Sequence, residues 1–83
     1  MICEFSNHAL AQLERRGIGK ELVENIIINP ENISNQDDGI SIYSKVVNEG
    51  SKFYLYRVFI NHVKNHLLVI TVYKTSKISK YAY

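Results

Sequence analysis

The spacing of apolar residues along the chain changes near Pro30 from a helical repeat to alternation. Residues 5–18 carry apolar side chains three and four positions apart, with Ser6 placed to cap the first turn and Gly17 placed to end the helix in the left-handed conformation. Residues 20–28 form a second apolar stripe, which Pro30 ends. Because the link between the two segments is short, the pattern predicts a helical hairpin.

The alternating half of the chain predicts β-strands. The strongest are residues 52–60 and 67–74, which are rich in β-branched and aromatic residues and which we expect to pair at the centre of a sheet. Residues 40–47 also alternate, and the polar turn at residues 48–51 joins them to the next strand as a hairpin.

Two segments complete the predicted sheet. Residues 32–36 are expected to form a short edge strand, and residues 75–83 form either a last edge strand or a tail packed on the sheet. The predicted fold class is therefore α+β. Two N-terminal helices pack on a twisted antiparallel sheet of three to four strands, in a single domain of 83 residues.

Cysteine content and hydropathy restrict the class of protein. The single cysteine, Cys3, excludes an internal disulfide and is typical of a reducing compartment. No apolar run approaches the ~20 residues that a membrane span needs, and the N-terminus has no signal-peptide pattern. We therefore expect a cytoplasmic protein that does not enter a membrane.

Charge is distributed unevenly between the two halves of the chain. All eight acidic residues lie in the first fifty positions, where four cations offset half of them. Residues 51–83 carry six cations and no acid, interleaved with tyrosines. A cationic surface with aromatic side chains is suited to a polyanion, so the sequence predicts RNA as a partner.

Three segments resemble a known family. Residues 5–9 (FSNHA) and 14–18 (ERRGI) resemble its S-x-H-A … E-R-G-I opening, and residues 69–81 (VITVYKTSKISKY) resemble its V-I-T-V-Y-x-T-S-K-x-x-K-Y ending. The family is the domain of unknown function 4258, whose fold is thought to be similar to RelE/ParE-like toxins. The resemblance implies a toxin ancestry, with mRNA cleavage or gyrase inhibition as the activity and a small acidic antitoxin as a possible partner.

His8 and Arg16 are the first candidates for chemistry. Helical spacing puts them on a similar face of the first helix. A histidine there can transfer a proton while a guanidinium binds a phosphate. Alternatively, His8 makes a structural hydrogen bond and Arg16 stabilises the C-terminal end of the helix.

Arg57 is a polar residue in an otherwise apolar row with Phe53, Leu55 and Phe59. An unpaired buried guanidinium costs several kcal/mol, so Arg57 must meet an acid, a carbonyl or a bound anion. It either pairs with a glutamate of a helix or clamps a phosphate on the sheet. Tyr73 of the next strand shares that surface in the second case and is ordinary packing in the first.

The lysines near the C-terminus recur every three residues, at Lys74, Lys77 and Lys80, with hydroxyl residues between them. Such a segment is suited to binding a phosphodiester backbone, with Tyr81 stacking on a base. Alternatively, the lysines form a solvated edge that discourages pairing with another sheet.

Metal-independent RNA cleavage needs a base for the 2′-hydroxyl and cations for the phosphorane. Candidates for the base are His8, His62, His66 or an activated tyrosine or lysine. The sequence has no cofactor motif, and His62 and His66 flank a predicted loop without a neighbouring acid or cysteine, so no metal site is expected.

Two functions remain open from the sequence. The first is a RelE/ParE-like toxin-family protein that acts as a metal-independent endoribonuclease, or an RNA-binding relic of one. The second is a non-catalytic module that binds nucleic acid or an acidic protein with the same basic surface. In the first case the catalytic residues are His8, Arg16, Arg57 and Tyr73.

Overall fold

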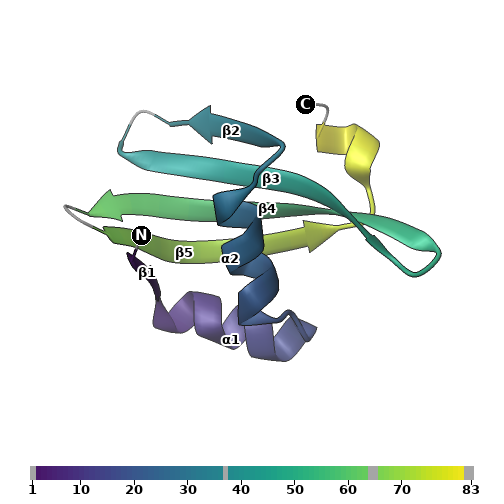
Figure 1. Cartoon of the computed structure of the whole chain (residues 1–83), viewed down its shortest axis with the longest axis horizontal. Coiled ribbons are helices and arrows are strands. Elements are labelled where there is room, and N and C mark those ends of the chain that lie inside the picture. Colours follow the sequence, from purple (N-terminus) through teal and green to yellow (C-terminus); the bar gives the residue numbers. More distant parts are fainter. Residues whose placement is uncertain (1, 37, 64–65, 82–83) are drawn as a thin grey trace.

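The computed structural model describes residues 2–36, 38–63 and 66–81, and all of their side chains except those of Ile2, Lys80 and Tyr81. It contains a five-stranded sheet in the order β1-β5-β4-β3-β2, two α-helices and a short 3-10 helix (Figure 1). No helix in the described ranges is long and apolar enough to cross a membrane. The elements in chain order are β1 (Ile2–Phe5), α1 (Asn7–Arg16), α2 (Lys20–Ile28), β2 (Asn32–Asn35), β3 (Ile40–Glu49), β4 (Lys52–Val63), β5 (His66–Thr75) and η1 (Ile78–Tyr81).

The prediction of an antiparallel sheet with three to four strands is wrong. The sheet has five strands and is mixed, because β1 precedes the helices and pairs in parallel with β5, from Ile2 opposite His66 to Phe5 opposite Val69. Four residues are too few to show an alternating pattern, and the partner of β1 lies at the other end of the sequence. The α+β class holds, with one strand ahead of the helices.

The remaining elements lie close to the predicted ones. The helix at residues 20–28 is confirmed, and the first helix is shorter than residues 5–18. The predicted central pair is also present, since β4 pairs with β5 in an antiparallel ladder. Of the ambiguous segment at residues 75–83, Thr75 ends β5 and η1 follows after a short bend.

The ends of α1 are fixed by local hydrogen bonds. The Ser6 hydroxyl accepts a bond of 3.1 Å from the backbone N–H of Ala9. At the other end Gly17 has φ of 64°, which a residue with a Cβ adopts only at a cost, and the N–H of Ile18 donates to Leu13 O at 2.9 Å. The helix therefore ends one residue after Arg16, which leaves Arg16 in its last turn.

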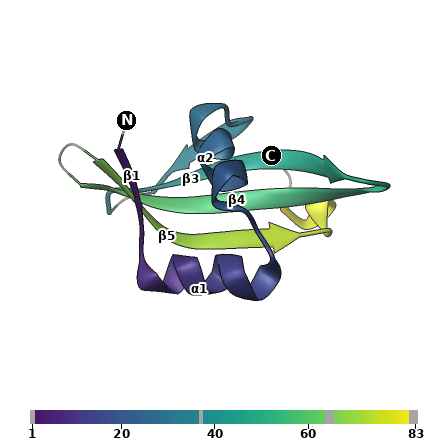
Figure 2. The same cartoon turned by 60° about the horizontal axis from the view of Figure 1, so that its bottom comes forward.

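Helix α1 runs beside β5 and takes over the edge of the sheet where β1 ends (Figures 1 and 2). β1 covers β5 only as far as Val69. Beyond that point, side chains of α1 and its cap bond to backbone groups of β5. The Ser6 hydroxyl donates to Ile70 O at 3.2 Å, and the Gln12 Oε1 accepts from the Val72 N–H at 2.8 Å. The Arg16 Nη2 donates to Lys74 O at 3.1 Å.

The two elements match in length along this edge. Ten residues of helix rise about 15 Å, and four residues of strand rise about 13 Å. One side chain from each successive part of α1 can therefore reach alternate backbone groups of β5. These contacts satisfy donors and acceptors that a strand would otherwise satisfy.

The core lies between the helices and one face of the sheet. Tyr56, Val58 and Ile60 alternate along β4 toward this face, and each is at most 1% exposed. They pack with Val23 and Ile26 of α2, which crosses the sheet (Figure 1). We call this the covered face, and its polar continuation beyond the helices forms the site described below.

Replacing Gln12 with alanine should destabilise the fold by about 1–3 kcal/mol, because it leaves the N–H of the buried Val72 without its acceptor. Chemical denaturation measures the change. Asn25→Ala, which removes an exposed amide side chain from α2, is the matched control and should change stability by less than about 0.5 kcal/mol. Equal effects of the two substitutions would contradict the role given to Gln12.

Candidate functional site

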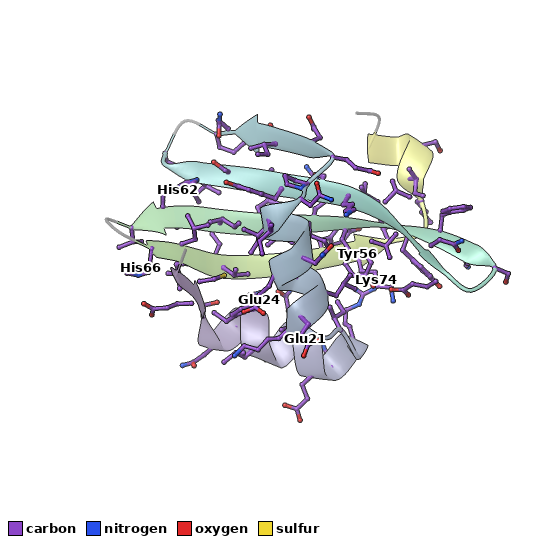
Figure 3. The ribbon with its side chains drawn as sticks, viewed as in Figure 1. Glu21, Glu24, Tyr56, His62, His66 and Lys74 are labelled. Atoms are coloured by element: carbon purple, nitrogen blue, oxygen red, sulfur yellow. The ribbon has the colours of Figure 1, made fainter. Side chains whose placement is uncertain are left out.

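A polar cluster lies on the covered face where the β3–β4 hairpin extends past the helices. The Lys74 Nζ donates to Glu49 Oε1 at 2.8 Å, and the Tyr56 hydroxyl donates to Glu49 Oε2. The lysine also lies over two aromatic rings, 4.4 Å from the centroid of Tyr54 and 5.6 Å from that of Tyr56. Figure 3 shows Tyr56 and Lys74 side by side beyond α2. The cluster thereby ties together three neighbouring strands.

The contacts of this cluster set its charge state. Hydrogen bonds from Lys74 and then Tyr56 hold the pKa of the Glu49 carboxyl below its usual range. The bond with Glu49 raises the pKa of the Lys74 ammonium, while burial, followed by the hydrogen bond to the carboxylate, raises the pKa of the Tyr56 phenol. At neutral pH the cluster therefore contains a carboxylate, an ammonium and a neutral phenol.

A shallow pocket opens next to this cluster, at the end of β5. Its volume is ≈ 340 Å³, at the lower end of the range of ligand sites. We call it the edge pocket. It is lined by Arg16, Tyr54, Tyr73, Lys74, Thr75, Ser76 and Lys77.

The lining of the edge pocket favours an anion. Three of its residues are cations, two carry hydroxyl groups, two are tyrosines and none is acidic. Glu49 neutralises Lys74, which leaves the charges of Arg16 and Lys77 on exposed residues at its rim. Guanidinium, ammonium and hydroxyl groups are the side chains that bind phosphate oxygens.

Four of the residues singled out in the sequence meet at this pocket, namely Arg16, Tyr73, Lys74 and Lys77. Lys74 differs from a solvated surface cation, because its side chain is only 18% exposed and is paired. The side chains of Lys80 and Tyr81 lie outside the described residues, so their predicted contacts with nucleic acid stay predictions.

His8 lies away from this group. It is an exposed residue in the first turn of α1, whereas Arg16 is in the last turn. Eight residues of helix separate them by about 12 Å along the axis. The structure therefore does not bring His8 next to the edge pocket, and its predicted role as the base stays a prediction.

Arg57 lies on the opposite face of the sheet from Tyr56 and Val58. It stands between Ser44 of β3 and Tyr73 of β5 in the register, and its guanidinium carbon is 5.5 Å from the centroid of the Phe59 ring. The helix glutamates considered as its partners belong to the layer on the other face.

The two strand histidines lie at the end of the sheet away from Tyr56 and Lys74 (Figure 3). The His62 Nε2 is 3.0 Å from the Ser41 hydroxyl, which donates its own proton to Asn35 Oδ1 at 2.8 Å. His62 and Asn35 thus both contact the Ser41 hydroxyl at this end of the sheet. His66 Nε2 lies 3.1 Å from Glu4 Oε1 and links β5 to β1.

A second pocket of ≈ 160 Å³ lies between β1 and α2 and is lined by Cys3, Glu24, Ile27 and Ile28. Burial, and then the Glu24 carboxylate, raise the pKa of the Cys3 thiol, so it stays protonated at neutral pH. Within the described ranges no three histidine, cysteine or acidic side chains gather as a metal site would require.

Sequence reasoning missed Glu49, Tyr54 and Tyr56. The hairpin turn is the two residues Gly50 and Ser51, so that β3 extends to Glu49, which pairs with Lys52. Counting by twos from this pair puts all three missed residues on one face. The signal was present, but it became readable only once the turn was placed at the glycine.

The stability of the fold should decline at both ends of the pH scale through the Glu49 cluster. Because the Glu49 pKa is lowered in the folded protein, its contribution is complete above the ordinary value of 4.5 and is lost as pH falls through the folded pKa. The pKa values of Tyr56 and Lys74 are raised in the folded protein. Their contribution to stability is therefore complete below the ordinary values of 10.0 and 10.5, and it is lost as pH rises through the pKa values of the folded state.

Thermal melting across pH tests this. Glu49→Gln should lower the melting temperature at pH 7 and flatten the acid and alkaline limbs of the profile. Glu14→Gln, on the exposed surface of α1, should keep the melting temperature and the pH profile of the wild type. A wild-type pH profile in Glu49→Gln would show that the cluster does not contribute.

Comparison with known proteins confirms the resemblance to a family. A sequence profile described as Domain of unknown function (DUF4258) matches residues 5–74, which is most of the chain. No curated protein and no solved structure shows a significant match, so the similarity to RelE/ParE-like toxins stays a prediction. The chain belongs to the DUF4258 family.

Proposed function

We propose that this protein binds single-stranded RNA through its phosphodiester backbone at the edge pocket. The observation that carries the proposal is the composition of the pocket, where Arg16 and Lys77 stand beside hydroxyl groups and tyrosines without an acidic residue in the lining. Cations track a backbone of phosphates, and aromatic rings stack on unpaired bases, so a single strand suits both features.

The position of Arg16 supports this role. One of its nitrogens is held by Lys74 O at 3.1 Å, which fixes the guanidinium at the pocket without neutralising it. A carbonyl accepts a proton but carries no net charge, so the positive charge stays available to a phosphate. A cation fixed in this way loses less conformational entropy on binding than a freely rotating one.

A second candidate function is metal-independent cleavage of the bound RNA, and the ionised Glu49 favours it. Glu49 lies 2.8 Å from Lys74, which lines the pocket. In this reaction the carboxylate takes the proton of the 2′-hydroxyl, whose oxygen attacks the adjacent phosphorus. The bond to the 5′-oxygen breaks as that oxygen takes a proton from water, giving a 2′,3′-cyclic phosphate and a 5′-hydroxyl. Arg16 and Lys77 offset the charge of the phosphorane.

Replacing Arg16 and Lys77 together with glutamine should weaken RNA binding and lower the salt dependence of the affinity. Each lost phosphate contact reduces the slope of log K against log salt by roughly 0.7, so the pair should reduce it by about 1.4. Fluorescence anisotropy with an oligouridine at several salt concentrations measures this. Arg15→Gln with Lys20→Gln removes the same charge from exposed residues outside the pocket and should leave the slope unchanged. Equal slopes for all three proteins would refute the edge pocket as the binding site.

If RNA is cleaved, Glu49→Gln should slow cleavage by about 10²-fold or more while RNA binding persists. The reaction is followed in EDTA, with the cyclic phosphate as the diagnostic product and the melting temperature as a check of folding. His8→Ala should leave the rate unchanged, because His8 is at the other end of α1. A loss of cleavage in His8→Ala alone would assign the base to the histidine instead.

A further inference from the structure

The face of the sheet opposite α2 carries a row of aromatic side chains. Phe53, Arg57 and Phe59 alternate along β4 away from the covered face, and Tyr73 stands opposite Arg57 on β5. We call these four residues the open face. In Figure 2 α2 lies on one side of β4, and the short η1 is drawn on the other side, toward the end of the β3–β4 hairpin.

The open face has a buried floor and three rings of different exposure, since Phe53 is exposed whereas Phe59 and Tyr73 are half-buried. Leu55 and Ile42, which point to the same side, are 1% and 6% exposed, while Phe53 is 57% exposed. The Arg57 guanidinium lies 5.5 Å from the Phe59 centroid, in a cation–π arrangement. Because more than half of the Phe53 side chain is exposed, its ring is accessible to a flat group of another molecule.

The charge of this face selects its partner. Glu49 is the one acid in strands β2 to β5, and its side chain is on the covered face. These strands therefore present Arg57 and no carboxylate on the open face. On these strands a nucleic-acid partner therefore meets no carboxylate, and the aromatic rings favour flat groups such as bases.

Tyr73 connects this face to the edge pocket, because it belongs to both. Neighbouring strands are about 4.8 Å apart, and the four steps along β4 from Arg57 to Phe53 span about 13 Å. Tyr73 and Phe53 are thus separated by the length of a few nucleotides. A strand whose phosphates occupy the edge pocket can lay its next bases over the sheet.

We propose that the open face is a base-stacking platform for single-stranded RNA, on which Phe53, Phe59 and Tyr73 contact bases that follow the phosphates held at the edge pocket. The proposal rests on the proposed RNA-binding function and adds the bases as a second recognised group. It assigns to Arg57 a cation–π position among those bases, in place of a clamp on a phosphate in a catalytic centre.

The test compares two polyanions, an oligouridine of about eight nucleotides and inorganic polyphosphate of similar charge, which has no bases. Phe53→Ala should lower RNA affinity about tenfold or more and leave polyphosphate affinity and the salt slope unchanged. Ile33→Ala, which truncates an exposed apolar side chain on β2, is the control and should change neither. Arg16→Gln should weaken both polyanions.

Each contrary result has one meaning. If Phe53→Ala binds RNA as the wild type does while Arg16→Gln binds it more weakly, the platform is refuted and the edge pocket remains supported as the binding site. Equal losses for RNA and polyphosphate in Phe53→Ala also overturn it, because stacking cannot act on a ligand without bases. If the wild-type protein binds neither polyanion, the proposed function and the platform fail together.

Discussion

The contact between α1 and the edge of β5 is the constraint on which the rest of the structure depends. β1 covers only the first part of that edge, and the polar side chains of α1 take over from Ile70 to Lys74. The arrangement closes an edge that would otherwise present unpaired backbone groups. The same hydrogen bond that closes the edge at Lys74 also places Arg16 at the mouth of the pocket. A structural requirement of the sheet thus positions the cation that we assign to phosphate binding.

The Glu49 cluster separates two kinds of positive charge at this end of the molecule. Lys74 is paired, partly buried and placed over tyrosine rings, so it stabilises the hairpin against β5. Arg16 and Lys77 are exposed and line the pocket without a carboxylate beside them. The acid-free C-terminal half of the sequence is therefore not one uniform basic surface. Lys74 forms an ion pair with Glu49, whereas we propose that Lys77, together with Arg16 of α1, binds an anion. Only Arg16 and Lys77 should affect the salt dependence of binding.

The sequence predicts those parts of the structure in which the interacting residues are close together along the chain. The caps of α1 act within one turn, and Ser6 and Gly17 behave as expected. The pairing of β4 with β5 follows from two strong alternating segments joined by a short loop. β1 was missed because its partner is more than sixty residues away, and no local pattern indicates a parallel pair of four residues. Glu49 was missed because the turn was assigned to residues 48–51, which put Glu49 in the turn and not on a face of β3. Arg16 was predicted as a site residue, but its bond to Lys74 O depends on where β1 stops, which the sequence does not show.

The central claim is that the open end of β5 beside α1 binds the RNA backbone. Titration of ¹⁵N-labelled protein with an oligouridine tests it most directly, because backbone amides report the site residue by residue. The account predicts that shifts concentrate at the backbone amides from Tyr73 to Lys77 and at the side-chain Nε of Arg16. Shifts confined to the pocket of Cys3, Glu24, Ile27 and Ile28, or no shifts at low salt, would contradict it.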